Sequence, residues 1–254
     1  MNVAEQWVEN ARKIIERIRE TQMENIGKAA DAVADSIIAG HVCYLFGAGH
    51  SHIPVEEMFP RYGGVVGFYP IIELPLSFFT HVTGDIGIGQ FSFLERTEGY
   101  GSRILENYAL HPQDAMIIYS HSGINQVIVD VALGAKEKSV ALIAVTSLAH
   151  SKALQSRHSS GKRLFELANI VIDTGVPYGD VMIEVDGLDQ KVGPGSTLGF
   201  VVVANMISCL VAQRIIDKGG KPFVNPVPRF TANYEEMLKE NVKEFRRRVA
   251  SHLP

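Results

Sequence analysis

The chain has little cysteine and tryptophan, with two Cys and one Trp in 254 residues, and it carries no excess of positive charge. Cys43 and Cys209 both lie in apolar stretches, so we expect buried free thiols in a reducing compartment rather than a disulfide. Lys and Arg number 24 against 28 Asp and Glu, a formal net charge of −4. This balance excludes the broad basic field that nucleic acid or an anionic membrane surface requires. Any bound anion must therefore be held locally, by hydrogen bonds.

Long uninterrupted apolar runs are also missing. Residues 1–20 are charged throughout and have no apolar centre of the kind that a signal peptide needs. The most hydrophobic stretch, residues 197–216, is interrupted by Asn205, Ser208, Gln213 and Arg214, which is typical of a buried helix rather than a membrane span. We therefore expect a soluble, cytoplasmic protein with no membrane partner.

The apolar pattern that is present changes between a helical period and short continuous runs. Apolar residues recur every three to four positions over residues 3–38 and predict a long helix, which Gly27 divides. Continuous apolar runs bounded by turn residues predict strands at 41–46, 63–72, 114–120, 139–147, 168–174 and, more weakly, 181–185. Further helices are predicted just before Pro60 and at 97–109, 124–138, 197–217 and 233–250.

This order of elements predicts an α/β fold with a doubly wound, mostly parallel sheet. The strand interiors are apolar on both faces, as in a sheet that helices cover on each side to give three αβα layers. We expect three parts: an N-terminal helical oligomerisation segment over 1–39, a central domain over 40–218, and a C-terminal extension with a helix over 219–254. Residues 73–94, which include His81 and Asp85, give no clear pattern and are a candidate region for substrate selection.

Two small polar loops follow predicted strands: GAGHSH at 47–52 and SHSGIN at 120–125. In an open parallel sheet, ligands bind beyond the carboxyl ends of the strands. Each loop leads into a helix, whose first turn offers unpaired N–H groups and the positive end of a dipole. The side chains expected to donate to one small anion are Ser51, Ser120, Ser122 and Asn125, while Gly47, Gly49 and Gly123 let the backbone approach it. The chemistry of these loops favours a phosphate group.

Other readings of these loops stay open. Gly-x-Gly after a strand often serves only the turn, and Ser122 is also a suitable N-cap. A dinucleotide-binding fingerprint needs glycine where His52 stands, and the Gly-Lys-Ser/Thr of a P-loop is missing. Two hydroxyl-rich loops at two strand ends of one sheet are harder to explain without a ligand.

Three segments resemble the sugar isomerase (SIS) domain: LFGAGHS, IIYSHSGINQVIVDVALGAKEKSVALIAVTS and GPGSTLGFVVVANMIS. The resemblance runs over about residues 40–218, and the chain looks most like bacterial stand-alone SIS proteins described as phosphosugar isomerases. It implies a flavodoxin-like three-layer fold and a phosphorylated sugar as ligand. Positions that match Ser51, Ser120, Ser122 and Asn125 bind the sugar phosphate in that family.

An aldose–ketose isomerase needs a general base and an acid that helps to open the sugar ring. Glu57 and Glu98 resemble the two catalytic glutamates of the N-acetylmuramic acid 6-phosphate etherases, in VEEMFPR and ERTE. His52, in HIPVEEMFPR, resembles part of the His-x-x-x-Glu motif with which phosphoheptose isomerases bind zinc. Those enzymes supply further ligands, including histidine, from the late helix, which has no histidine here, so we expect no metal and no cofactor.

The sequence therefore predicts a sugar-phosphate isomerase that uses Glu57 or Glu98, with His52 as a further catalytic candidate. One alternative is a lyase that cleaves an ether on an amino-sugar phosphate with the same two carboxylates. Another is a regulatory protein that binds a sugar phosphate without turnover, against which the absence of a helix-turn-helix extension and the negative net charge both count. The apolar stripe over residues 3–38, with Trp7, predicts a homodimer or homotetramer.

Overall fold

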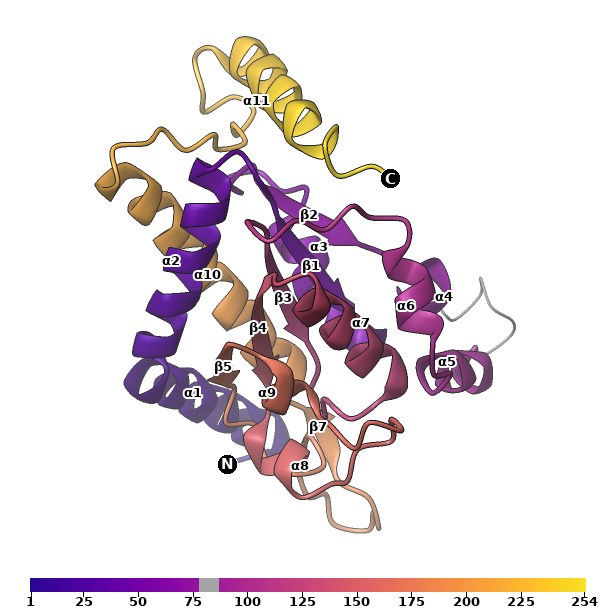
Figure 1. The fold of residues 1–254 in the computed structure, drawn as a ribbon. Coiled ribbons are helices and arrows are strands. Elements are labelled where there is room, and N and C mark those ends of the chain that lie inside the picture. The colour runs from indigo at the N-terminus through magenta and orange to yellow at the C-terminus, as the bar shows by residue number, and fades with distance from the viewer. Residues whose placement is uncertain (78–86) are drawn as a thin grey trace.

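A computed structural model describes residues 1–77 and 87–254, and its centre is a parallel sheet (Figure 1). The sheet has five strands in the order β2-β1-β3-β4-β5. Its strands are β1 (Cys43–Gly47), β2 (Phe68–Ile71), β3 (Ala115–Tyr119), β4 (Ala141–Thr146) and β5 (Ile170–Asp173). All four pairings are parallel, which confirms the predicted doubly wound sheet. The winding reverses between β1 and β3, the position at which such sheets bind ligands.

The strands are apolar throughout because both faces of the sheet are covered. In β1, Cys43 and Leu45 belong to the core on one face, while Tyr44 and Phe46 belong to the core on the other, and all four are fully buried. The first face carries α1 (Val3–Thr21), α2 (Met23–Ile38), α3 (Ile53–Met58) and α10 (Ser196–Asp217). The second carries α4 (Leu74–Ser77), α5 (Ile88–Glu95), α6 (Tyr100–Leu105), α7 (Gln126–Glu137) and α9 (Leu164–Leu167).

Several predicted element boundaries are wrong. The long N-terminal helix breaks at Gln22 and not at Gly27, because the Gln22 side chain accepts a hydrogen bond from the Asp173 N–H at 3.0 Å and ties the break to β5. The helix expected at 97–109 is the shorter α6, so Glu98 precedes it. The weakly predicted strand is β6 (Val181–Ile183), which pairs with β7 (Val192–Pro194) in a separate antiparallel sheet. Within 73–94, α4 and α5 flank residues 78–86, so His81 and Asp85 lie outside the described residues.

Helix α10 is long and apolar enough to cross a membrane by length and composition, as the core helices of many soluble proteins are. One face of α10, including Phe200, Val203 and Ile207, is buried in the core with α2. The opposite side leaves Cys209 exposed, so the prediction of a buried thiol is wrong for this residue. Cys43 is buried as predicted, and burial raises the pKa of its thiol.

The C-terminal extension lies against the amino ends of the strands, where α11 (Tyr234–Val249) packs (Figure 1). Arg248 is buried and donates to the carbonyl oxygens of Ile37 at 2.6 Å and His41 at 2.9 Å. The Phe245 ring stacks on Phe59 with 4.8 Å between centroids. Helix α11 is therefore attached to the rest of the molecule by both polar and apolar contacts.

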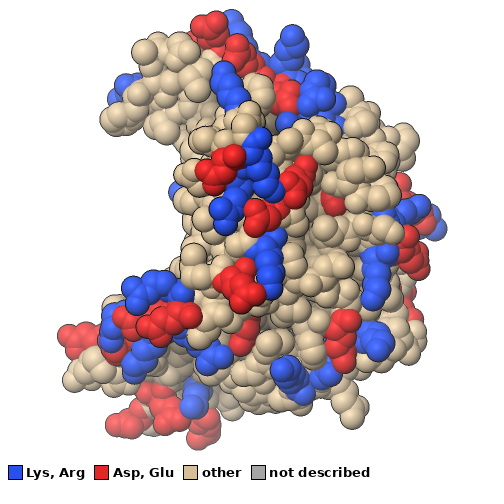
Figure 2. Space-filling view, turned by 60° about the vertical axis from the view of Figure 1, so that its left-hand side comes forward, with Lys and Arg blue, Asp and Glu red and all other residues tan. Residues whose placement is uncertain are grey.

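Positive and negative side chains are intermixed on the face shown in Figure 2, around a hollow that is mostly uncharged. Many charged side chains of the protein are paired, as in Arg12–Glu16 at 2.6 Å and Arg214–Asp31 at 3.1 Å. The face shown therefore offers no broad field of a single sign.

Candidate functional site

The loops after β1 and β3 enclose one polar cavity at the carboxyl end of the sheet. The cavity measures about 310 Å³ and lies beside the position where the winding of the sheet reverses. It is lined by Ala48, Ser51, Glu95, Ser120, His121, Ser122, Asn125, Ile128, His150, Gly179 and Asp180. The structure thus brings together Ser51, Ser120, Ser122 and Asn125, the polar side chains that were predicted to hold an anion. A larger cavity of about 520 Å³, beside α11, is mostly apolar and contains none of these groups.

Two of the three predicted glycines, Gly49 and Gly123, support the cavity without lining it. Gly49 has φ +61°, and a Cβ there would lie 2.9 Å from the ring of Phe91. Gly123 has φ +63°, and a Cβ there would lie 3.0 Å from Cβ of Leu164. The Gly123 N–H donates to Ser120 Oγ at 3.0 Å. Glycine at these positions therefore lets both loops turn tightly against their neighbours.

The amino end of α7 is open toward the cavity. Asn125 occupies the N-cap position, but its side chain makes no capping hydrogen bond. It instead donates to Glu95 Oε2 at 2.7 Å and accepts from Arg157 Nη1 at 2.6 Å. Among the described residues, the first-turn N–H groups of α7, at the positive end of its dipole, therefore receive no capping side chain. Arg157 adds a guanidinium group at the rim of this arrangement.

Glu95 is a carboxylic acid in the cavity wall that no sequence motif indicates. It ends α5 and reaches the cavity beside Asn125. Desolvation by burial raises the pKa of Glu95, and the hydrogen bond from Asn125 opposes this shift. A carboxyl group with a raised pKa, in a cavity, is suited to exchange a proton with a bound molecule.

Two histidines, His121 and His150, also line the cavity. Both ring nitrogens of His121 are buried, and neither has a hydrogen-bond partner among the described residues. Burial lowers the pKa of His121 to about 4, so the ring is neutral at neutral pH. His150 lies against it, with 4.5 Å between ring centroids, and its Nδ1 accepts from the Gly179 N–H at 3.0 Å. The neutral His150 ring therefore carries its hydrogen on Nε2.

Asp180 brings a negative charge to the same cavity. Its carboxylate accepts from the N–H of Ser196 at 2.7 Å and the N–H of Gly195 at 3.0 Å, and from Ser196 Oγ at 2.8 Å. These bonds occupy the amino end of α10, so that helix end is filled by the protein itself. An anionic group of a ligand is expected at α7 rather than at α10.

The catalytic residues predicted from the sequence lie outside the cavity lining. Glu57 pairs with Arg61 at 2.9 Å and accepts from Asn205 at 3.2 Å. Glu98 is exposed and accepts from the Ser159 backbone N–H at 2.9 Å and from the Ser159 hydroxyl, and these bonds lower its pKa. His52 is buried, with Nδ1 against the Gly49 carbonyl oxygen and Nε2 3.7 Å from Glu56. Their catalytic roles stay predictions.

We expect His121 to make the protein less stable in acid. Its folded pKa of about 4 is below the ordinary value of 6.5, so the unfolded chain takes up a proton first as the pH falls. The stability that neutral His121 contributes is complete above pH 6.5 and is lost as the pH falls toward 4. Allowing for partial exposure, the loss between pH 7 and 4.5 is about 2 kcal/mol.

The measurement is the free energy of urea unfolding of wild type and His121→Asn at both pH values. Glu95 has a raised pKa, which acts with the opposite sign, but it is present in both proteins and cancels in the comparison. The wild type is expected to lose more stability than the variant on acidification. Parallel pH dependence in the two proteins would show that His121 does not titrate in this way.

Comparisons with known proteins agree with this fold. The family model described as the SIS domain matches residues 6–147. A UPF0309 protein of Shouchella clausii is 37% identical over 84% of this chain and 85% of its own. Another, of Thermoanaerobacter pseudethanolicus, is 34% identical over 96% of this chain and 98% of its own. The solved structure of a phosphoheptose isomerase from Francisella tularensis is similar with a TM-score of 0.51, over 83% of this chain and 96% of that one at 13% identity, a likeness of fold.

Proposed function

The chain belongs to the SIS domain family, and from this membership we propose that its polar cavity binds a phosphorylated sugar and that the protein isomerises it. The observation that carries the proposal is the meeting of two hydroxyl-bearing loops with the open amino end of α7 in one cavity. Its volume of about 310 Å³ is at the lower end of the range for small-molecule sites, which fits a single sugar phosphate.

The phosphate is proposed to lie between the loop after β1 and the amino end of α7. Ser51, Ser120 and Ser122 supply hydroxyl donors there, and α7 supplies N–H groups and its dipole. Asn125 and Arg157 complete this side, with Asn125 held in place by Glu95. The net charge of −4 makes such local donors necessary, since the protein as a whole does not attract anions.

Proton transfer is proposed to use the titratable side chains of the cavity wall. Isomerisation moves a proton between the two carbons of an aldose–ketose pair, and the base must lie within hydrogen-bond reach of that proton. Glu95 is the glutamate in the cavity wall, and its raised pKa suits it to this role. His150 Nε2–H is suited to donate toward a ring or carbonyl oxygen. Glu57, Glu98 and His52 remain candidates that need movement of a loop or another subunit to reach the ligand.

Sugar phosphates are expected to raise the melting temperature of the protein, and the same sugars without phosphate are not. Each phosphate is tested with its parent sugar, because a ligand that binds only the folded protein stabilises it by mass action. Ser122→Ala is expected to weaken binding by about 10-fold, since the loss of one hydrogen bond to a charged group costs about 1.5 kcal/mol. Ser102→Ala, an exposed serine on α6, is the control and is expected to bind as the wild type does.

The ligands that bind are then incubated with the protein in deuterated water and followed by NMR. Deuterium at the carbon beside the carbonyl, with interconversion of aldose and ketose, supports the isomerase. Loss of an ether substituent from an amino-sugar phosphate would indicate the lyase instead, and binding without exchange would indicate a regulatory protein. If no sugar phosphate changes the melting temperature, the cavity does not bind this class of ligand.

The homodimer or homotetramer predicted from the sequence is proposed to form through the N-terminal helices. On α1, Val3, Val8 and Ile15 are exposed large apolar residues. The apolar face of α2 is used within the chain, where Ile26 and Val33 are buried against the core of the central domain. Helix α1 is therefore the part of the proposed 1–39 segment that is available to another subunit.

A further inference from the structure

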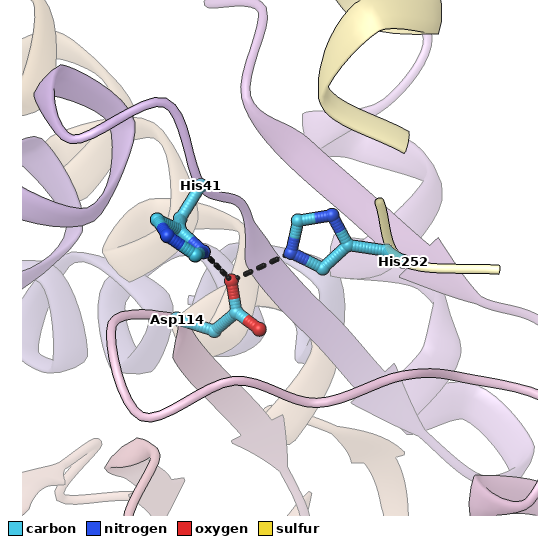
Figure 3. Close-up of side chains that lie close together, drawn as sticks. All are labelled: His41, Asp114 and His252. Carbon is cyan, nitrogen blue, oxygen red and sulfur yellow. Dashed lines mark hydrogen bonds and ion pairs between the residues drawn. The ribbon is translucent and has the colours of Figure 1, made fainter. Parts of the chain in front are cut away.

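A second group of ligand-type side chains lies at the amino end of the sheet, far from the polar cavity. His41 precedes β1, Asp114 precedes β3, and His252 follows α11 (Figure 3). Asp114 and Ser120 lie at opposite ends of β3, so the two sites are separated by about 20 Å, from a rise of about 3.3 Å per residue. No sequence pattern indicates these three residues, because they are distant in sequence and follow no motif.

The three side chains point at one another. Asp114 Oδ1 is 3.1 Å from His41 Nδ1 and 2.8 Å from His252 Nε2, and Figure 3 shows both rings directed at this one oxygen. The three ligand atoms all lie within 4.8 Å of one another. Among residues 1–77 and 87–254, no other group of three His, Cys, Asp or Glu residues meets this condition.

The hydrogen bonds of His252 direct its Nε2 lone pair at the Asp114 carboxylate. Its Nδ1 is 2.7 Å from the Arg248 carbonyl oxygen, which can only accept, and 3.1 Å from Ser251 Oγ, which itself donates to that carbonyl at 3.0 Å. The hydrogen of a neutral ring therefore lies on Nδ1. Its Nε2 lone pair then faces a carboxylate oxygen at 2.8 Å. His252 and Asp114 are 0% and 1% exposed, so water does not screen this contact. Two buried acceptors at this distance are stabilised by a positive charge between or beside them, which either a proton or a metal ion supplies.

The surroundings hold these ligands in place as they do in known metal sites. Ligating histidines usually donate their other ring N–H to a carbonyl or carboxylate, as His252 does to Arg248. Asp114 Oδ2 accepts from the His111 backbone N–H at 2.7 Å, and Oδ1 accepts from the Val42 N–H at 3.3 Å. The carboxylate is therefore fixed in orientation before any cation arrives.

We propose that His41, Asp114 and His252 bind one divalent transition-metal ion of the zinc class. Two imidazole nitrogens and one carboxylate oxygen form a ligand set that zinc accepts, with water at the remaining position. A proton can satisfy one nitrogen–oxygen pair, whereas a metal ion uses all three atoms. The His41 side chain is 25% exposed, which gives the ion a path from solvent.

The bound ion connects three segments that are far apart in the chain. It joins the turn after α2 and the loop before β3 to the tail after α11, and it adds to the contacts of Arg248. Its role is to fix the C-terminal extension to the sheet. The proposal is independent of sugar-phosphate binding, because it concerns the opposite end of the sheet.

The test uses the full-length protein, stripped with a chelator and then titrated with zinc chloride. We expect one zinc per chain, and a rise in melting temperature of about 5–10 °C at a 100-fold excess over Kd. Cobalt(II) in place of zinc is expected to give a visible absorption band that reports nitrogen and oxygen ligands. A melting temperature that zinc does not raise would overturn the proposal. It would indicate that a proton joins His252 Nε2 to Asp114 Oδ1.

Variants locate the ion. His252→Ala is expected to abolish zinc binding and the thermal shift, and His41→Ala, at a partly exposed position that keeps the fold, to weaken binding by at least 10-fold. His111→Ala is the control: its ring centroid is 5.0 Å from that of His252, its Nε2 bonds the Ser251 carbonyl oxygen, and its backbone N–H to Asp114 survives the substitution. Zinc binding that persists unchanged in His41→Ala, for example at His121 and His150, would also overturn the proposal.

Discussion

Glu95→Gln is expected to lower the rate of deuterium exchange into a bound sugar phosphate by about 10²- to 10⁴-fold, with its Kd changed by no more than a few-fold. The carboxyl group lines the polar cavity and has a raised pKa, while glutamine has nearly the same shape and cannot take a proton. The amide oxygen of glutamine can still accept the 2.7 Å hydrogen bond from Asn125, so we expect the proposed phosphate-binding groups to keep their positions. This variant is therefore expected to bind the sugar phosphate but to lose most of the exchange activity.

The matched variants are Glu98→Gln and Glu57→Gln. Both residues are engaged elsewhere, Glu98 with Ser159 and Glu57 with Arg61, and neither lines the cavity. We expect each to keep most of the exchange rate. A large loss in Glu98→Gln or Glu57→Gln, with little change in Glu95→Gln, would instead assign the base to the residue that the resemblance indicated. It would also mean that a loop or a second subunit brings that residue to the ligand.

Gly47→Ala is expected to destabilise the protein by about 3 kcal/mol and to weaken sugar-phosphate binding by more than about 100-fold. A Cβ at Gly47 would lie 2.1 Å from the Ser51 carbonyl oxygen and 2.6 Å from its carbonyl carbon. These are backbone atoms and cannot rotate away. Gly47 itself is held in the sheet opposite Tyr119, so the loop that carries Ser51 must move.

The same substitution at Gly27 is the control, with an expected change of opposite sign. Gly27 lies inside α2 and has nothing within 4 Å of an added Cβ. Gly27→Ala is expected to stabilise the protein by about 0.5–1 kcal/mol, because alanine has the higher helix propensity. Urea unfolding measures both stabilities, and calorimetric titration with a sugar phosphate measures binding. Wild-type affinity in Gly47→Ala would show that the loop after β1 does not hold the phosphate.

The parallel sheet could be predicted because its strands are buried on both faces. Continuous apolar runs such as 114–120 have few alternatives, and the helix between β3 and β4 follows from its period. The helix break at Gln22 could not be predicted from the sequence, because it depends on a hydrogen bond with Asp173, a residue distant in sequence. Strand β7 was missed for a similar reason: only its pairing with β6 makes three residues a strand.

The meeting of the two polar loops could be predicted, and the other residues of the cavity lining could not. Ser51, Ser120, Ser122 and Asn125 follow strands of one sheet, so topology alone brings them together. Glu95, His150 and Asp180 reach the same cavity from α5, α8 (Leu148–Lys152) and the loop before β6, which no local pattern shows. Glu57 and Glu98 were predicted because they resemble motif positions of a related family. A motif does not determine whether a side chain reaches the cavity.

The polar cavity holds groups of both signs, and this limits the charge of the ligand that fits it. Arg157 and the amino end of α7 supply positive charge, whereas Glu95 and Asp180 bring two carboxyl groups to the same cavity. A molecule with one phosphate and a tail of neutral hydroxyl groups adds a single negative group to this balance. A bisphosphate, or a sugar acid with a carboxylate besides its phosphate, would add a second negative group near these carboxyl groups. We therefore expect the cavity to select its ligand by charge as well as by shape.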